Sequence, residues 1–336
     1  MKNKKLYDIW DNFATFDRLI RAYYRAASGK HNREGVLSFH SRLERNIFNI
    51  RDDLLSEKYE WGTYRNFWVT DPKRRLIESA PFRDRIVHQA ITEVLEPWID
   101  PAFYYHSYAC RSGKGTHAAV KRVQSWASDC PEQHYLQMDV SKFFPSINRD
   151  KLFELVTIKI GDEKMLRLIE SLLKNSPGIG GIPIGNLTSQ LFANLYLDPL
   201  DQYIKRTLRV SHYVRYMDDF VIIHPSRTEL QSIRKKIEQF GDEILKLKFH
   251  PNKVILGRVK DGIGFVGFRS LPNAIYIRGK SLRRFRKRML ENLTLDKKVK
   301  RLLSYQGHFS HATDSKRLIQ SFRETAFPEG IFMARL

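Results

Sequence analysis

Two short apolar runs flank a pair of adjacent aspartates, and this feature constrains the fold more than any other. Residues 213–217 and 220–223 are rich in aromatic and β-branched side chains, which favour strands. Asp218 and Asp219 stand between them, in a position where aspartate often makes a turn. Neighbouring carboxylates repel each other and raise each other's pKa, and a bound cation would offset this repulsion. The pattern predicts a β-hairpin whose tip is either an ordinary turn or a cation-binding site.

A third aspartate ends another predicted strand, and the order of elements brings it toward the hairpin. Asp139 lies in the predicted strand 135–140. Helices are predicted over 187–204, after a glycine-rich turn, and over 230–244, where apolar residues recur at steps of 3 and 4. With a last strand at 254–259, the order is β-α-β-β-α-β, a split βαβ arrangement whose first and third strands are neighbours. If Asp139 lies close to the hairpin tip, an ordinary turn does not explain why three carboxylates meet there.

The rest of the chain divides into three parts by composition. We expect an N-terminal helical extension over 1–60, a core over 61–275 and a basic helical part over 276–336. Within the core, residues 61–77 look strand-like, and a helix through residues 86–95 is expected to end at Pro97. A basic loop at 111–116 precedes another helix.

The charge balance indicates a polyanionic partner. The 336 residues include 58 lysines and arginines against 37 aspartates and glutamates, a net charge of +21. Nucleic acid is the leading candidate. An anionic membrane surface is the alternative, but we find no lipidation signal and no apolar run near the roughly 20 residues of a membrane span. Two cysteines and the absence of a secretory signal suit a reducing cytoplasm.

Five segments resemble, in the same order, the motifs of reverse transcriptases. They are a fingers motif at 107–117, the first catalytic motif Gln137-Met-Asp-Val-Ser-Lys-Phe-Phe-Pro-Ser-Ile147, the nucleotide-cradling segment Gly181-Ile-Pro-Ile-Gly-Asn-Leu-Thr-Ser-Gln190, the box Tyr216-Met-Asp-Asp219 and the primer-grip hairpin Gly264-Phe-Val-Gly-Phe268. One motif alone is weak, but five in order are specific. The resemblance implies an α+β right-hand polymerase with fingers, a split βαβ (βαββαβ) palm and a small helical thumb.

The resemblance also implies the catalytic roles. Asp139 and Asp218 would be the principal metal ligands, Asp219 a weaker one, and the backbone carbonyl of Val140 a further one. Two Mg²⁺ ions, with Mn²⁺ as a substitute, would activate a primer 3′-hydroxyl and stabilise the leaving pyrophosphate. Lys253 would protonate the pyrophosphate, although it could equally be a surface lysine.

The resemblance implies a set of nucleotide contacts as well. Phe144, five residues after Asp139, would be a steric gate that collides with a 2′-hydroxyl and so selects dNTPs, unless it is an ordinary core residue. Arg75 and Lys73 would hold the triphosphate, with a solvated charge run as the alternative. The other expected nucleotide-binding residues are Ile184, Gly185 and Gln190.

Template RNA and a DNA or RNA primer are the expected macromolecular partners. The candidate contacts lie in the fingers motif, the primer grip and the basic tail, which would track backbone phosphates unless its charges are merely solvated. They are Arg111, Lys114, Phe265, Gly267, Arg283, Arg284, Arg286 and Lys287.

The nucleotide-cradling segment departs from the commoner pattern of the family. Ile184 and Gln190 stand where many members have glutamine and proline. This variant resembles the reverse transcriptases of diversity-generating retroelements, which work in the cytoplasm of bacterial or phage-infected cells with a small basic accessory protein. We therefore expect error-prone cDNA synthesis, or mutagenic retrohoming. Retron, defence-associated and group II-like reverse transcriptases remain alternatives, although Leu336 leaves no room for a maturase portion.

Two other classes of function stay open. An RNA polymerase or primase on the same palm would not need Phe144. A non-enzymatic RNA-binding protein could use a βαββαβ module, but such modules stack bases on aromatic residues of the sheet, where this chain has aspartates. His308 and His311 lack a third zinc ligand in the sequence.

Overall fold

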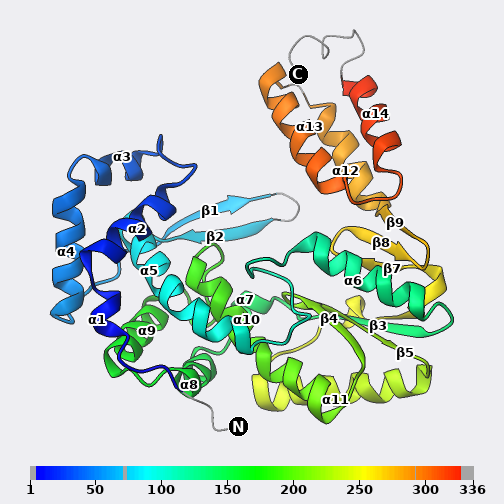
Figure 1. The fold of residues 1–336 in the computed structure, drawn as a ribbon, viewed down its shortest axis with the longest axis horizontal. Helices are drawn as coiled ribbons and strands as arrows, with labels where there is room; N and C mark the ends of the chain where they lie inside the picture. The colour runs from blue at the N-terminus through cyan, green and yellow to red at the C-terminus, as the bar shows by residue number, and fades with distance from the viewer. Residues whose placement is uncertain (1–4, 71–73, 292, 327–336) are drawn as a thin grey trace. The chain divides into compact units, whose positions relative to one another are not determined.

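The computed structural model describes residues 5–70, 74–291 and 293–326 (Figure 1). Two compact units divide the chain. One unit is drawn from Met1–Tyr105, Val140–Thr207 and Lys236–His250, and the other from His106–Asp139, Leu208–Lys235 and Pro251–Leu336. The chain crosses between the units several times, so each is built from segments far apart in the sequence.

The second unit contains a four-stranded antiparallel sheet in the order β4-β5-β3-β6. Its strands are β3 (His134–Asp139), β4 (His212–Tyr216), β5 (Asp219–His224) and β6 (Ile255–Arg258). The first and third strands in chain order are therefore neighbours at the centre, which confirms the predicted split βαβ order. Helix α6 (Thr116–Asp129) covers this sheet, where Val123 and Trp126 pack against Val214 and Val221 (Figure 1).

A small sheet and three helices complete the second unit. The sheet runs β7-β8-β9, and its strands are β7 (Ile263–Phe265), β8 (Phe268–Leu271) and β9 (Ala274–Ile277). The helices are α12 (Gly279–Met289), α13 (Leu295–Phe309) and α14 (Ser315–Ala326). The ring centroid of Phe285 lies 5.5 Å from that of Phe309 and 4.1 Å from that of Phe322. Phe268 belongs to the same core, so the basic helices are anchored to the sheet by apolar packing.

The first unit is mainly helical. Its helices are α1 (Trp10–Phe13), α2 (Phe16–Ala27), α3 (Glu34–His40), α4 (Leu43–Leu55), α5 (Phe82–Ile99), α7 (Phe143–Ser146), α8 (Arg149–Lys159), α9 (Glu163–Asn175) and α10 (Leu187–Gln202). A hairpin of β1 (Arg65–Val69) and β2 (Arg75–Ser79) stands between α4 and α5 in the sequence. The predicted amphipathic helix is α11 (Arg227–Leu245), which contains residues of both units. No helix in the described ranges is long and apolar enough to cross a membrane.

Helix α5 does not end where the sequence predicted. It continues through Pro97 to Ile99, so the predicted end at this proline was wrong. A proline removes one helical hydrogen bond, but here it lies in the last turn. The backbone N–H of Asp100 still donates to the carbonyl of Glu96, and the fully buried Ile99 holds the turn against the core.

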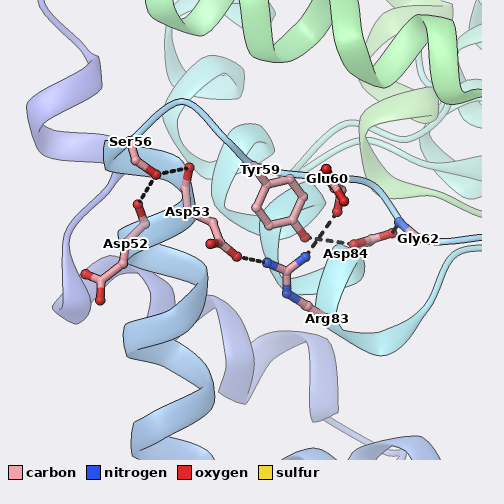
Figure 2. A network of polar contacts seen from close by, with 8 residues as sticks. All are labelled: Asp52, Asp53, Ser56, Tyr59, Glu60, Gly62, Arg83 and Asp84. Carbon is pink, nitrogen blue, oxygen red and sulfur yellow. Dashed lines mark hydrogen bonds and ion pairs between the residues drawn. The ribbon is translucent and has the colours of Figure 1, made fainter.

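A polar network joins the end of α4 to the start of α5 (Figure 2). Arg83 forms an ion pair with Asp53, and its guanidinium carbon lies 4.2 Å from the ring centroid of Tyr59. The Tyr59 hydroxyl donates to Asp84 at 2.7 Å, and the Gly62 N–H donates to the same carboxylate at 2.8 Å. Burial raises the pKa of Asp84, and these two hydrogen bonds oppose the increase. The network fixes the segment that leads into β1.

Candidate active site

The turn between β4 and β5 lies one residue earlier than predicted. Tyr216 pairs with Asp219, so the turn residues are Met217 and Asp218, and Asp219 already belongs to β5. Met217 has a positive φ of 55°, which is uncommon for a residue with a side chain. The fully buried Arg215 donates a hydrogen bond to the Met217 carbonyl at 3.0 Å. A buried arginine therefore supports the strained tip.

The three aspartates come together as the sequence predicted. Asp139 lies directly opposite Asp219 in the β3–β5 register, and side chains of opposed residues project from the same face of a sheet. The charges of both Asp139 and Asp218 act on Asp219 and raise its pKa. Their convergence is thus a feature of the fold, while their catalytic role stays a prediction.

Burial and the neighbouring negative charges both disfavour the ionised form of Asp219. Burial is the largest cause that raises the pKa of Asp219 to about 7, and Asp139 and Asp218 add to it. The amide of Gln137 opposes the increase by donating to both oxygens of Asp219, at 2.8 and 3.2 Å. Lys253 also opposes it and forms an ion pair with Asp139. Lys253 is therefore part of the cluster and not a free surface lysine.

The donor chemistry of the cluster fits a divalent cation. Carboxylate oxygens are the ligands that hard cations such as Mg²⁺ prefer, and Asp139 and Asp219 project from the same face of the sheet. Within residues 5–70, 74–291 and 293–326, no three His, Cys, Asp or Glu side chains are grouped as a ready metal site. In the cluster itself, Asp139 is held by Lys253 and Asp219 by Gln137.

The side chains of the basic loop at 111–116 contact residues that precede the loop. Arg111 donates to the carbonyl and hydroxyl of Ser107 at 3.0 and 2.7 Å, and the Lys114 ammonium lies 5.3 Å from the ring centroid of Tyr108. The Tyr108 N–H donates to the carbonyl of Arg215 at 3.0 Å. The loop thus braces β4, and binding of nucleic acid by Arg111 and Lys114 stays a prediction.

The primer-grip prediction needs one correction. The Phe265 side chain is fully buried in the core beside Val259 and Ile263, so the prediction that it contacts nucleic acid directly was wrong. Side chains along a strand point alternately to its two faces, and Phe265 lies on the face that packs against the core. Gly267, with a φ of 93°, lies in the β7–β8 turn, where its backbone is accessible.

The basic residues of α12 lie where the predicted amphipathic pattern places them. Phe285 and Met289 face the core. Arg283, Arg286 and Lys287 are exposed, and Arg284 is half-buried. The exposed charges are available for phosphate contacts, and their role stays a prediction.

The predicted nucleotide-binding residues belong to the first unit. Phe143 is buried whereas Phe144 is partly exposed, so Phe143 and not Phe144 is the core residue of this pair. Arg75 is exposed at the start of β2, Ile184 and Gln190 are half-buried, and Gly185 is exposed with a φ of 117°. Val140 is buried in a bridge to Phe249. Lys73 lies outside the described residues.

Sequence reasoning missed three polar residues that organise the site. Gln137 had a usable signal, because a polar residue two positions before Asp139 lies on the same face of an otherwise apolar strand. Arg215 carried no such signal, since only the folded hairpin brings its guanidinium to the Met217 carbonyl. Arg149, described below, was missed because its partners lie 28–32 residues away.

A split sheet with a two-aspartate hairpin facing a third aspartate defines the palm of a template-directed polymerase. The profile of the "Reverse transcriptase (RNA-dependent DNA polymerase)" family matches residues 70–270, more than half of the chain. The chain therefore belongs to the reverse transcriptase family, and its enzyme class is RNA-directed DNA polymerase.

Curated relatives include bacterial and intron-encoded proteins. Protein YkfC of Escherichia coli K12 is 26% identical over 274 residues, which cover 68% of this chain and 72% of YkfC. The group II intron-encoded protein LtrA of Lactococcus lactis subsp. cremoris is 22% identical over 266 residues, covering 58% of this chain and 44% of LtrA. An uncharacterized 91 kDa protein in the Schizosaccharomyces pombe cob intron is 29% identical over 170 residues, covering 47% and 21%. The matched part is under half of the two intron proteins.

Solved structures confirm the fold class. Apo telomerase from Candida tropicalis superposes with a TM-score of 0.55 at 12% identity, covering 86% of this chain and 63% of that chain. Telomerase from Candida albicans, in complex with a TWJ fragment of telomeric RNA, superposes with a TM-score of 0.54 at 10% identity, covering 81% and 57%. At such low identity the likeness shows the fold alone, and that fold is the predicted α+β right-hand polymerase.

Proposed function

We propose that this protein copies a template RNA into cDNA by nucleotidyl transfer at the aspartate cluster of β3 and the β4–β5 hairpin. The observation that carries the proposal is the opposition of Asp139 and Asp219 on the central strands, with a carboxyl pKa raised to about 7. Reverse transcriptase domains generally use divalent metal ions. Two Mg²⁺ ions, or Mn²⁺ as a substitute, are the proposed pair.

Each residue of the cluster has a distinct part in the proposed reaction. When bound, the metal pair supplies Lewis-acid chemistry at the primer 3′-hydroxyl and the leaving pyrophosphate. Asp139 and Asp218 hold the ions, and Gln137 orients Asp219 through its two hydrogen bonds. Lys253, already next to Asp139, donates a proton to the pyrophosphate.

We assign selection and binding of the incoming dNTP to three residues of the predicted nucleotide-binding set. The partly exposed ring of Phe144 excludes a 2′-hydroxyl, while Arg75 and Lys73 bind the triphosphate. The exposed cations of α12 bind phosphates of the primer–template duplex.

Primer extension on an RNA template with Mg²⁺ tests the proposal. Asp139→Asn and Asp218→Asn should each abolish extension while leaving RNA binding intact. Asp129→Asn, at an exposed position at the end of α6, is the matched control and should extend like wild type. Loss of RNA binding together with extension in Asp218→Ala would favour the non-enzymatic RNA-binding class.

We propose further that the enzyme is error-prone and belongs to a diversity-generating retroelement, in which it works with a small basic accessory protein. The support is Ile184, since an apolar side chain in place of an amide removes a polar contact from the nascent base pair and lowers discrimination. Ile184→Gln should reduce misincorporation opposite template adenines, measured by sequencing the cDNA. An unchanged error spectrum would remove this part of the proposal.

A group II intron-type reverse transcriptase is the second candidate. Its support is the similarity to the group II intron-encoded protein LtrA. The two candidates differ in the fidelity they predict. A low error rate of the unmodified enzyme at template adenines would favour the group II type.

A further inference from the structure

Arg149 is a half-buried arginine whose guanidinium donates hydrogen bonds to a neighbouring loop and not to its own helix. It is the first residue of α8. Its Nε donates to the carbonyl of Gly181 at 2.7 Å, and one terminal nitrogen donates to the carbonyls of Pro177 and Gly180 at 2.5 and 3.3 Å. The start of α8 is capped separately, because the Asn148 side chain accepts from the Lys151 N–H at 2.8 Å. The guanidinium is thus free of any capping role.

The loop that Arg149 holds is hydrogen-bonded to the backbone of the turn that contains Phe144. The Ile182 N–H donates to the Phe144 carbonyl at 3.0 Å, and the Gly181 N–H donates to the Ile147 carbonyl at 3.0 Å. A Cβ added to Gly181 would lie 2.6 Å from the Pro145 Cα and 2.7 Å from the Phe144 carbonyl oxygen. The contact is therefore so close that movement of the loop displaces the Phe144 turn.

The tip of the loop, residues 178–180, is exposed. Its tip residue Ile179 is fully exposed, and Gly178 and Gly181 both have positive φ values, 74° and 76°. A glycine-rich tip has high conformational entropy, whereas Ile182 at the end of the loop is buried. The three hydrogen bonds from Arg149 add to the two backbone hydrogen bonds of Gly181 and Ile182 in ordering the loop.

The charge of Arg149 also acts on two groups outside the loop. Its charge and that of Glu78 on β2 act on each other, as do those of Arg149 and Tyr64. The Tyr64 hydroxyl accepts from the amide of Asn186 at 2.9 Å, and Asn186 directly precedes α10. Arg149 thus holds the glycine-rich loop that contacts the Phe144 turn, and its charge also acts on Glu78 and Tyr64.

We infer that Arg149 is a positioning residue for sugar selection, which acts by fixing the glycine-rich loop against the Phe144 turn. The inference rests on the proposed function, because it assigns to Arg149 the precision of the proposed gate. A gate excludes a 2′-hydroxyl only while its ring is held to within a fraction of an ångström, and a small misplacement has a large effect on rate.

The test compares dNTP and rNTP use in primer extension on RNA, as the ratio of the two kcat/KM values. Arg149→Gln should lower the preference for dNTP by about tenfold, the scale of one lost charged hydrogen bond, through better use of rNTP. Arg149→Lys should restore part of the preference, since lysine donates to a carbonyl but lacks the planar fork. Arg167→Gln, which loses an exposed ion pair with Glu57, is the matched control and should keep the wild-type ratio.

A double-mutant cycle separates positioning from general stability. If Arg149 acts through Phe144, then Arg149→Gln with Phe144→Ala has the same dNTP preference as Phe144→Ala alone. Equal losses of dNTP and rNTP use in Arg149→Gln, with an unchanged ratio, would overturn the inference. Should Arg149→Gln not fold, Gly181→Ala, which pushes the loop from Pro145, should lower the ratio in the same way, and an unchanged ratio there also overturns it.

Failure of the proposed function has a different signature. It appears as no extension by the wild-type protein on any RNA template. Extension by Phe144→Ala with an unchanged dNTP preference would leave the polymerase intact and would remove both the gate and the role of Arg149.

Discussion

Protonation of His88 should destabilise the first unit in mild acid. His88 lies on α5, and its Nδ1 is 2.8 Å from the hydroxyl of Thr188 in the nucleotide-cradling segment. Its Nε2 is buried and has no hydrogen-bond partner among the described residues. Burial, with a smaller contribution from the charge of Arg85, lowers the pKa of His88 to about 3. The folded state therefore keeps this imidazole neutral.

The expected loss of stability follows from the difference in proton binding. An unfolded histidine titrates at about pH 6.5. Between this value and the folded pKa of about 3, the unfolded chain binds more protons, so stability falls as the pH falls. At pH 5 the loss is about 2 kcal/mol, from about 1.4 kcal/mol for each unit of pH below 6.5.

Urea unfolding followed by tryptophan fluorescence measures this loss. The ring centroid of Trp61 lies 5.2 Å from that of His88, so one fluorophore reports on the site. His88→Gln cannot titrate, and its change in unfolding free energy between about pH 7.5 and pH 5 should be about 2 kcal/mol smaller than that of wild type. His31→Gln, at an exposed position, is the control, and its unfolding free energy should change with pH as that of wild type does. Identical pH dependence in wild type and His88→Gln would refute the reasoning.

Three further predictions concern the aspartate cluster and the basic helix. Asp219→Asn should raise the free energy of unfolding by about 2–4 kcal/mol at pH 8 without metal, because a carboxyl with a raised folded pKa loses stability as the pH rises; an unchanged urea midpoint would contradict this. Lys253→Met should lower kcat in single-turnover extension by about 10–100-fold with a smaller change in KM, and an equal change in both would exclude proton donation. Arg283→Ala with Arg286→Ala should reduce the salt dependence of duplex affinity, measured by fluorescence anisotropy, by about two phosphate contacts. If affinity fell with salt concentration at the same slope in the variant and wild type, these two arginines would not contact phosphates.

The sequence predicted the sheet well because its strands carry redundant local signals. Residues 213–217 and 220–223 combine β-branched side chains with a turn, and β4 and β5 follow these limits to within one residue. The strand order then followed from the element order alone. The approach of Asp139 to the hairpin was predicted from these two patterns, whereas its opposition to Asp219 depends on the register that the structure shows.

The errors arise where tertiary contacts override local preference. The β4–β5 turn moved by one residue because Arg215 stabilises a positive φ at Met217, a conformation that no local rule assigns to methionine. Helix α5 passed Pro97 because the buried Ile99 holds its last turn. Phe265 was assigned to nucleic acid from its motif, whereas the core around Val259 takes the ring.

The two hydrogen-bonding partners of the cluster differ in charge, and this difference supports an order among the ligands. Asp139 is held by Lys253, whose positive charge a metal ion can replace without leaving the carboxylate uncompensated. Asp219 is held by the neutral amide of Gln137, which occupies both of its oxygens and lies on the same strand as Asp139. A metal ion would have to compete with that amide for Asp219 but only exchange with an ammonium at Asp139. These two contacts support the proposal that Asp139 is a principal metal ligand and Asp219 a weaker one.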